Sequence, residues 1–390
     1  MSNGAQVKVL HILGELKPSG AELMLLAASP RWRQTGITGE IICTGQRLGV
    51  LAPQLEESGF VIHHLPFSRS IQHIRAVYRL IRSSNCQVVH LHTERANVWY
   101  GLAAVMARRR MILRTLHNVF PFQGALRVRR LVSRAVLRTM GVRSIAISES
   151  VRDCEAANFH NPTEVVPNWF DDRKYVPSSD NVRMAARKQL GISGNVFVVL
   201  TVAGCWEYKN HGAILHALAS MPDRHEMIYL HVGMEDEHRS EAKLAEELGI
   251  DGAVRFIGVV DDITRYLYAA DAYLMPSLWE GFGCSAIEAM GAGLPVVLSR
   301  VPGLRDFART CPDVVWVNPT AKSVRRAIQR LQEMAPEERR RIGLRLSESA
   351  HRCFGTGVGA VRYAELYLQN QSRRQPDSKL PPAAPCGQAQ

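Results

Sequence analysis

Short apolar runs of strand length alternate with helical patterns along most of the chain. Runs that predict buried strands and the loops at their ends lie at 7–13, 40–43, 61–65, 88–93, 112–118, 144–150, 164–168, 196–202, 227–233, 254–262, 272–275 and 295–298. Helical spacing of apolar positions is clearest at 71–82, 125–140, 214–218, 284–290 and 356–369. Strands that alternate with helices predict βαβ units, and therefore an α/β fold with parallel sheets.

The succession of strand, loop and helix starts twice, so the 390 residues predict two domains of ordinary size. The first covers 1–170 and the second 171–350, and the polar segment 170–179 is the expected linker. A last helix is predicted within 351–369. The tail, 370–390, contains four prolines and has no periodicity, which predicts disorder.

The stretch 276–297, PSLWEGFGCSAIEAMGAGLPVV, carries the densest set of chemical groups. Gly281 and Gly283 precede a predicted helix, and free backbone N–H groups at a helix N-terminus favour an anion. Glu280 lies in the glycine loop and Glu288 lies eight residues later, inside the helix. Ionised carboxylates accept hydrogen bonds only, so sugar and ribose hydroxyls are suitable partners for both. A purely structural corner with two surface glutamates is the alternative.

This stretch resembles the Glu-x7-Glu signature of the family 4 retaining glycosyltransferases, which have two Rossmann-like domains facing each other across a cleft. Three further segments are similar to the family's motifs: AGCWEYKNH at 203–211, SGAE at 19–22 and VVHLH at 88–92. Lys209 is in register with the family's loop lysine, but Gly204 stands where the family has an arginine. Trp169 replaces the glycine of another motif, and the loop after Gly233 also departs from the family pattern.

The resemblance implies a role for each matching residue. Glu288 holds the ribose hydroxyls and Glu280 the sugar, while Lys209 neutralises the diphosphate. His117 lies beside the donor sugar, although it could instead only cap a strand. His117, Lys209 and Glu280 are therefore the expected catalytic residues. The expected donor-binding set is Gly20, Gly204, Lys209, Val259, Glu280, Gly281, Phe282, Gly283, Cys284, Ser285 and Glu288. The helix within 351–369 is expected to cross back to the first domain.

We predict neither a metal nor any cofactor besides a nucleotide-sugar co-substrate. His90 and His92 share one face of a strand, but the sequence shows no third ligand near them. The acidic segment 235–237 reads as a solvated loop. The family resemblance also implies a metal-independent reaction that retains the anomeric configuration.

Positive charge is concentrated in the first domain. Residues 1–170 hold 21 Lys and Arg against 10 Asp and Glu, whereas the other 220 residues hold 27 against 26. The segment 95–148 has eleven arginines and no acidic residue. Four of them follow helical spacing, Arg127, Arg130, Arg134 and Arg138, and valines 128, 132 and 136 can face inward. Such a helix suits an anionic membrane surface or an acceptor; a solvated, salt-bridged helix is the alternative. Interleaved aromatic residues and nucleic-acid motifs are missing, so nucleic acid is not expected.

The sequence shows no signal peptide, no apolar run long enough to span a bilayer, and eight cysteines without framework spacing. We therefore expect a cytoplasmic protein with reduced thiols, peripheral at the inner face of the plasma membrane. The expected function is transfer of a hexose from a UDP- or GDP-sugar to a lipid-linked or polysaccharide acceptor, as in envelope polysaccharide assembly. The alternatives are a nucleotide-sugar epimerase and a silent subunit that binds sugar nucleotides.

Overall fold

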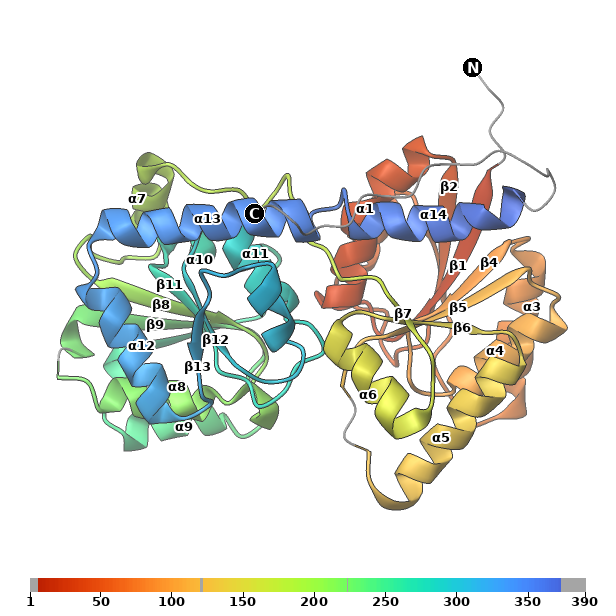
Figure 1. Cartoon of the computed structure of the whole chain (residues 1–390), viewed down its shortest axis with the longest axis horizontal. Helices are drawn as coiled ribbons and strands as arrows, with labels where there is room; N and C mark the ends of the chain where they lie inside the picture. The colour runs from red at the N-terminus through yellow and green to blue at the C-terminus, as the bar shows by residue number, and fades with distance from the viewer. Residues whose placement is uncertain (1–5, 120–121, 223, 373–390) are drawn as a thin grey trace.

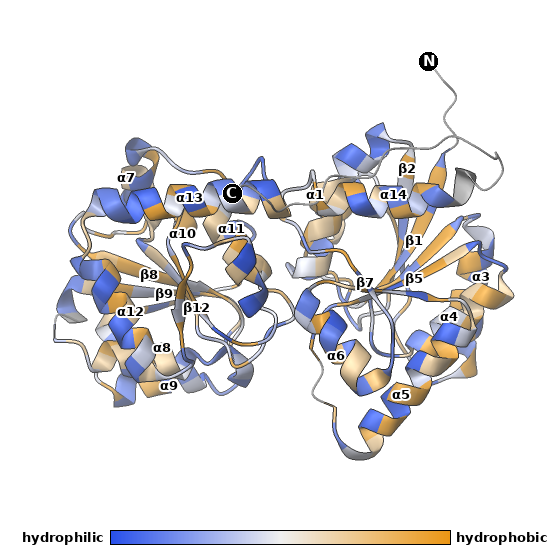
Figure 2. Ribbon diagram, viewed as in Figure 1, coloured by the Kyte–Doolittle hydropathy of each residue, from blue (hydrophilic) through white to orange (hydrophobic). Residues whose placement is uncertain are grey.

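A computed structural model describes residues 6–119, 122–222 and 224–372, and it confirms the predicted α/β fold with two parallel sheets (Figure 1). Every strand pair in this part of the chain is parallel. Strands that are buried on both faces read as continuous apolar runs, which is why the sequence pattern reveals them so clearly. Figure 2 shows these apolar strands inside each domain and the polar positions on the outer helices.

The first sheet has the order β3-β2-β1-β4-β5-β6-β7. Its strands are β1 Val7–Leu13, β2 Ile37–Cys43, β3 Val61–His64, β4 Val88–Leu91, β5 Met111–Leu116, β6 Arg143–Ala146 and β7 Glu164–Val165. Its helices are α1 Gly20–Gln34, α2 Ala52–Glu57, α3 Ile71–Ser83, α4 Asn97–Met106, α5 Gly124–Thr139 and α6 Glu149–Phe159. Serine caps fix two helix starts, because Ser70 Oγ accepts from His73 N and Ser148 Oγ accepts from Val151 N.

The second sheet has the order β10-β9-β8-β11-β12-β13. Its strands are β8 Phe197–Val202, β9 Met227–Val232, β10 Val254–Gly258, β11 Ala272–Met275, β12 Val296–Ser299 and β13 Val315–Val317. Its helices are α7 Asp180–Gln189, α8 His211–Ala219, α9 Ser240–Glu247, α10 Thr264–Ala269, α11 Cys284–Gly291, α12 Ala321–Glu333 and α13 Pro336–Phe354. Short 3₁₀ turns occur at Glu207–Lys209, Arg224–Glu226, Asp251–Ala253 and Arg305–Arg309.

Strand order reverses between β1 and β4 in the first sheet and between β8 and β11 in the second. Such switch points leave a crevice at the carboxyl ends of the strands, where open α/β sheets bind ligands. Gly20 follows β1, Lys209 follows β8 and Glu280 follows β11. The topology therefore places these three candidate residues at ligand-binding edges.

The two domains share apolar packing. One cluster joins Leu116, Ile147 and Val151 of the first domain to Phe282 and Met290 of the second. The last helix, α14 Gly359–Ser372, lies beside the first domain, in line with α13 (Figure 1). It begins three residues later than predicted and covers the first three residues of the expected disordered tail; residues 373–390 lie outside the described part of the chain.

Tryptophans secure the return of α14. Trp32 Nε1 donates to Ala360 O over 2.8 Å, and Trp169 Nε1 donates to Met24 O over 3.0 Å. A side chain at Gly359 would meet the Trp169 ring at 2.3 Å, so glycine there lets the helix start against the indole. Trp169 thus has a packing role that explains its departure from the family's glycine. Within the described residues, no helix has the length and apolar content that crossing a membrane requires.

Candidate active site

The loops after β8 and β11 lie side by side because these two strands are neighbours in the sheet. Leu278 N donates to Tyr208 O over 2.7 Å, and Asn210 Nδ2 donates to Pro276 O over 2.9 Å. The Tyr208 and Trp279 rings stack with centroids 5.4 Å apart. These contacts hold the Lys209 loop against the glycine loop.

Lys209 and Glu280 form an ion pair, with Nζ 2.6 Å from Oε1. Ser277 Oγ donates to the same oxygen over 2.8 Å. Both charged side chains are largely buried, with 16% of Lys209 and 9% of Glu280 exposed, so solvent screens their interaction weakly. Lys209 and Glu280, which belong to two separate sequence motifs, therefore form one ion pair at the carboxyl ends of the strands.

Glu288 lies in α11 and is also buried, at 6% exposure. Within the described residues its carboxyl group has no hydrogen-bond partner that the structure shows. Burial raises the pKa of Glu288 to about 8, and the positive charge of Lys174 opposes this shift. Without a ligand Glu288 is therefore mostly protonated at neutral pH, and the ribose-binding role that the resemblance implies for it stays a prediction.

The start of α11 has the geometry of an anion site. Gly283 is its N-cap, with φ of +96°, a conformation that glycine adopts without strain. Phe282 anchors the loop by packing between Phe307 and Phe354. Ser285 Oγ bonds to Tyr273 OH over 2.7 Å. The first amides of α11 are thereby held in place beside the Lys209–Glu280 pair.

The first domain contacts this loop directly. A side chain at Gly281 would come within 2.2 Å of His117 O, and Ser148 Oγ donates to Gly281 O over 2.8 Å. A side chain at Gly20 would meet Cys284 Sγ at 2.8 Å. The structure therefore brings His117 and Gly20 to the start of α11, as the resemblance implied.

His117 ends a row of three imidazoles, of which His11 is fully buried and His92 and His117 are partly buried. His117 Nε2 lies 3.1 Å from His92 Nδ1, and His92 Nε2 lies 3.1 Å from His11 Nδ1. Burial lowers the pKa of His117 to about 4, so the ring is neutral at physiological pH. His90 bonds instead to Thr115 Oγ1 and Tyr367 OH, each at 2.7 Å.

The prediction that His90 and His92 lack a third partner was wrong. β1 pairs with β4 so that His11 lies opposite His90. One ring nitrogen of each of His11, His90 and His92 therefore lies within 4.8 Å of the others. Register between strands far apart in the sequence cannot be read from one strand's periodicity.

Comparisons with known proteins agree with this geometry. Residues 2–174 match the family described as Glycosyltransferase Family 4, and residues 182–345 match the family described as Glycosyl transferases group 1. The chain belongs to the family 4 glycosyltransferases. This membership confirms the resemblance seen in the Glu-x7-Glu stretch and the Lys209 loop.

Relatives of the glycosyltransferase include two Escherichia coli proteins. It is 23% identical over 325 residues to an Escherichia coli protein named UDP-Gal:alpha-D-GlcNAc-diphosphoundecaprenol alpha-1,3-galactosyltransferase, covering 77% of this chain and 81% of the relative. It is 34% identical over 143 residues to the Escherichia coli lipopolysaccharide glucosyltransferase WaaG, covering 36% of this chain and 38% of the relative.

Solved structures confirm the two-domain fold. Anabaena HepE, crystallised with UDP and glucose, superposes with a TM-score of 0.79 at 20% identity over 94% of this chain and 100% of that one. WaaG superposes with a TM-score of 0.73 at 17% identity over 93% of this chain and 99% of that one. The glycosyltransferase therefore has the B-type fold of paired Rossmann-like domains.

The arginine helix of the glycosyltransferase differs from its prediction. Arg134 is buried and donates to Glu155 over 2.7 Å and to Glu94 over 3.1 Å. Arg130 is mostly covered and donates to Glu94 O, while Arg138 donates to His160 O. Val128 and Val132, expected to face inward, are 62% and 52% exposed. Glu94 and Glu155, just outside the arginine-rich segment, pair with Arg134, so the face of α5 that carries Arg134 packs inward and the face with Val128 and Val132 is exposed.

Two candidate residues lie apart from the glycine loop. Val259 follows β10 at the edge of the sheet and is exposed. Gly204 has no side chain to contact phosphate, and its carbonyl accepts from His211 Nε2 over 3.1 Å. Lys174 was missed by sequence reasoning because it lies in the crossing segment, yet its charge acts on Glu288.

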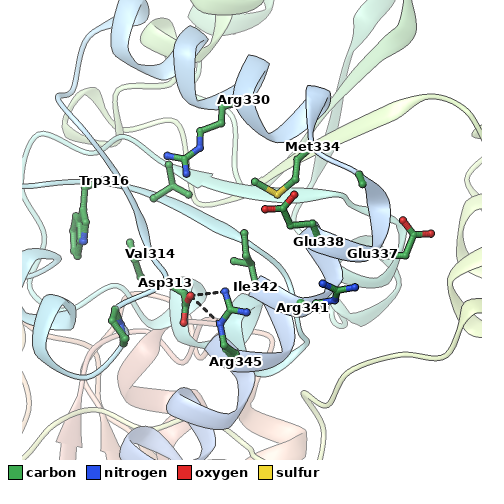
Figure 3. A pocket seen from close by; sticks show the side chains of 13 residues that line it. Asp313, Val314, Trp316, Arg330, Met334, Glu337, Glu338, Arg341, Ile342 and Arg345 are labelled. Carbon is green, nitrogen blue, oxygen red and sulfur yellow. Dashed lines mark hydrogen bonds and ion pairs between the residues drawn. The ribbon is translucent and has the colours of Figure 1, made fainter.

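A hollow among the described residues lies elsewhere, between α12, α13 and β13 (Figure 3). Its volume is about 870 Å³, and Arg345 spans one side with its bonds to Asp313 of 2.6 and 2.9 Å. It opens beside 312–316, where the chain enters β13, whereas ligands bind at the carboxyl ends of strands. None of the candidate residues lines it, so it is separate from the candidate active site.

Proposed function

We propose that the chain transfers a hexose from a UDP- or GDP-sugar to a lipid-linked or polysaccharide acceptor, with retention of anomeric configuration. The observation that carries this proposal is the Lys209–Glu280 pair beside the α11 N-terminus and the buried, unpaired Glu288. HepE was crystallised with UDP and glucose, and one relative is named for UDP-galactose, which favours UDP.

The leaving diphosphate defines what the site must do. Negative charge grows on it as the glycosidic bond breaks, and fixed positive groups stabilise that charge. Lys209 and the first amides of α11 supply them. Lys209 is available because its ammonium, held on Glu280, can contact phosphate with its other protons.

Glu288 is suited to the ribose hydroxyls. A carboxyl with a pKa of about 8 is mostly protonated at pH 7, whereas a carboxylate that accepts two hydroxyls is stabilised in its charged form. Donor binding therefore releases a proton below pH 8. Neutral His117 bonds to the sugar from the facing domain, and the contacts at Gly281 and Gly20 exclude water that would hydrolyse the donor.

We propose that this reaction needs no divalent ion on the phosphates. A bridging ion requires carboxylate ligands, and Glu280 is instead occupied by Lys209 and Ser277. In the acidic segment 235–237, Glu235 pairs with Arg239, and the Asp236 carboxylate accepts a hydrogen bond from Ser240 N. Lysine and helix amides take the place of the metal's charge.

The test is release of nucleoside diphosphate from a panel of UDP-, GDP- and ADP-sugars, with membrane extract as acceptor. We expect turnover of one donor, equal in EDTA and in added Mg²⁺. NMR of the product should show the donor's anomeric configuration. Tight binding of a donor without turnover would favour the silent-subunit alternative, and conversion of the donor sugar without release would favour an epimerase.

The acceptor proposal rests on an exposed surface of the first domain. We define the α4–α5 surface as Trp99, Met106, Val128, Val132, Arg127 and Arg129, all exposed. Trp99 and Met106 are seven residues apart on α4, and the two valines are four apart on α5, so each pair shares a helix face. Apolar side chains interspersed with arginines suit the interface of an anionic membrane. We place the protein at the cytoplasmic face, with no role for nucleic acid.

Vesicle co-sedimentation tests this surface. Val128→Asp/Val132→Asp should weaken binding to phosphatidylglycerol vesicles without changing donor binding. Val182→Asp, on exposed α7 of the second domain, is the matched control and should bind as wild type. Equal binding of all three proteins to the vesicles would contradict the membrane proposal.

A further inference from the structure

Cys205, His211 and His231 form a buried cluster behind the Lys209 loop. Cys205 lies in the loop after β8, His211 begins α8 and His231 lies in β9. They are 8%, 2% and 0% exposed, and one donor atom from each lies within 4.8 Å of the others. Three elements thus converge on one point with a thiol and two imidazoles.

The donor spacing fits a tetrahedral ion. Zn–S and Zn–N bonds of about 2.3 and 2.05 Å at a tetrahedral angle place sulfur and nitrogen about 3.5 Å apart. Cys205 Sγ is 3.6 Å from His231 Nε2. The alternative at this distance is a weak S–H···N hydrogen bond, and the experiment below distinguishes the two.

The second ring nitrogen of His211 also fits ligation. His211 Nε2 lies 3.1 Å from Gly204 O, and a ligating histidine usually donates its other N–H to such a carbonyl. That leaves His211 Nδ1, 3.4 Å from Tyr229 OH, with only a weak partner. His231 Nε2 faces the Cys205 sulfur and is the atom available to ligate. Its Nδ1 has no hydrogen-bond partner among the described residues, so His211 alone has the second bond that is usual for a ligating histidine. Glu241 on α9 acts electrostatically on the Cys205 thiol, but its carboxylate does not belong to the group of donor atoms that lie within 4.8 Å of one another.

The His11–His90–His92 cluster is a weaker candidate. Both nitrogens of His90 already bond to hydroxyl groups at 2.7 Å, and His11 and His92 bond to each other at 3.1 Å. It also lacks a sulfur or carboxylate donor, which would add charge to a Zn²⁺ site. The histidine cluster therefore serves as an internal control.

We propose that Cys205, His211 and His231 bind a Zn²⁺ ion, with water in the fourth position. The ion would tie the loop that leads to Lys209 onto β9 and α8. It would lie behind the donor phosphates and not bridge them. This inference does not rest on the proposed transfer reaction, because metal binding is measured without a donor.

The test is titration of the chelator-stripped full chain with Co²⁺ and then with Zn²⁺. Wild type should bind one Co²⁺ per chain, with the near-ultraviolet charge-transfer band of a thiolate ligand, and Zn²⁺ should displace it. Cys205→Ser should lose the band, and His231→Gln should bind at least 100-fold more weakly. Cys311→Ser, which removes another buried thiol, and His92→Gln should behave as wild type.

Folding of each variant is checked by circular dichroism, but the wild-type spectrum alone can decide. Failure of wild type to bind Co²⁺ with a thiolate band would overturn the proposal. An unchanged band in Cys205→Ser would overturn it as well. Loss of binding in His92→Gln with retention in His231→Gln would assign the ion to the histidine cluster instead.

Discussion

At the scale of single residues, Glu288 is the group whose behaviour burial decides most strongly. The sequence identified it as a site residue, but the sequence alone suggested a charged carboxylate. Its burial in α11 raises its pKa to about 8, although the charge of Lys174 opposes the shift. The free chain therefore holds a neutral carboxyl where the ligand would favour a charged one.

Glu288→Gln should change the pH dependence of stability. A carboxyl whose pKa is raised on folding destabilises the fold as pH rises from about 4.5 through 8, because the native state must give up its proton. The variant should be more stable than wild type by roughly 3–5 kcal/mol at pH 9 and equal to it near pH 4. Urea unfolding at both pH values measures this. Exposed Glu333→Gln is the control, and an equal pH profile for Glu288→Gln and wild type would contradict the burial argument.

At the scale of elements, α5 shows what periodicity can and cannot predict. The arginine spacing predicted the helix, and the structure has it at Gly124–Thr139. Periodicity assigned its valine face to the interior. Glu94 and Glu155 lie outside the arginine-rich segment 95–148. Their carboxylates pair with Arg134 and hold it in the interior of the domain. Which face packs inward depends on partners that the fold brings together.

Arg134→Met should destabilise the first domain strongly. Removing one member of a buried ion pair leaves Glu155, itself 2% exposed, without its counter-charge, at a cost of about 3–5 kcal/mol. Arg127→Met, on the exposed side of the same helix, should change stability by less than about 0.5 kcal/mol. Chemical denaturation of both variants is the measurement. Similar stability of the two would show that the buried network contributes little.

The glycine loop offers a second test at this scale. A Cβ at Gly281 would lie 2.2 Å from His117 O, so Gly281→Ala should push the domains apart at the site. We expect a lower melting temperature, and a donor affinity reduced at least 10-fold if the domains close over the donor. At Gly212 in α8 a Cβ meets only the Leu244 side chain at 3.7 Å, so Gly212→Ala is the control. Wild-type donor affinity in Gly281→Ala would rule out a need for this close contact.

The sequence anticipated the strands, the α/β class and the central loops, because continuous apolar runs and glycine-bounded turns are local signals. It could not anticipate His11 beside His90, since strand register joins positions 79 residues apart. The roles of Lys174 and Ser277 at the site were missed for a related reason, because no local sequence pattern indicates a functional role for either residue. Trp169 read as a departure from a motif, whereas its indole packs α14 onto the first domain.

At the scale of the whole molecule, the first domain is built around imidazoles that must stay neutral. Burial lowers the pKa of His11 to about 3 and that of His117 to about 4, and it lowers those of His90 and His92 well below the usual range. The unfolded chain binds protons at these rings below about pH 6.5, whereas the folded chain does not. Stability should therefore fall as pH decreases from about 6.5.

His11→Asn isolates one of these rings. For each protein we compare its unfolding free energy at pH 7 with that at pH 5. A loss of packing in the variant lowers both values equally and therefore cancels in this difference. Wild type should lose about 2 kcal/mol more than His11→Asn over this interval, because one proton fewer binds on unfolding the variant. Urea unfolding measures the two differences. Equal losses would show that His11 titrates normally in the folded chain.

The central claim is that Lys209, held on Glu280, stabilises a leaving nucleoside diphosphate. The most direct measurement is the rate of diphosphate release from the donor that wild type uses, for Lys209→Met beside exposed Glu207→Gln of the same turn. Loss of a positioned charge-stabilising group costs about 10²- to 10³-fold in rate, so we predict that loss for Lys209→Met and wild-type turnover for Glu207→Gln. Wild-type turnover by a folded Lys209→Met protein would contradict the account.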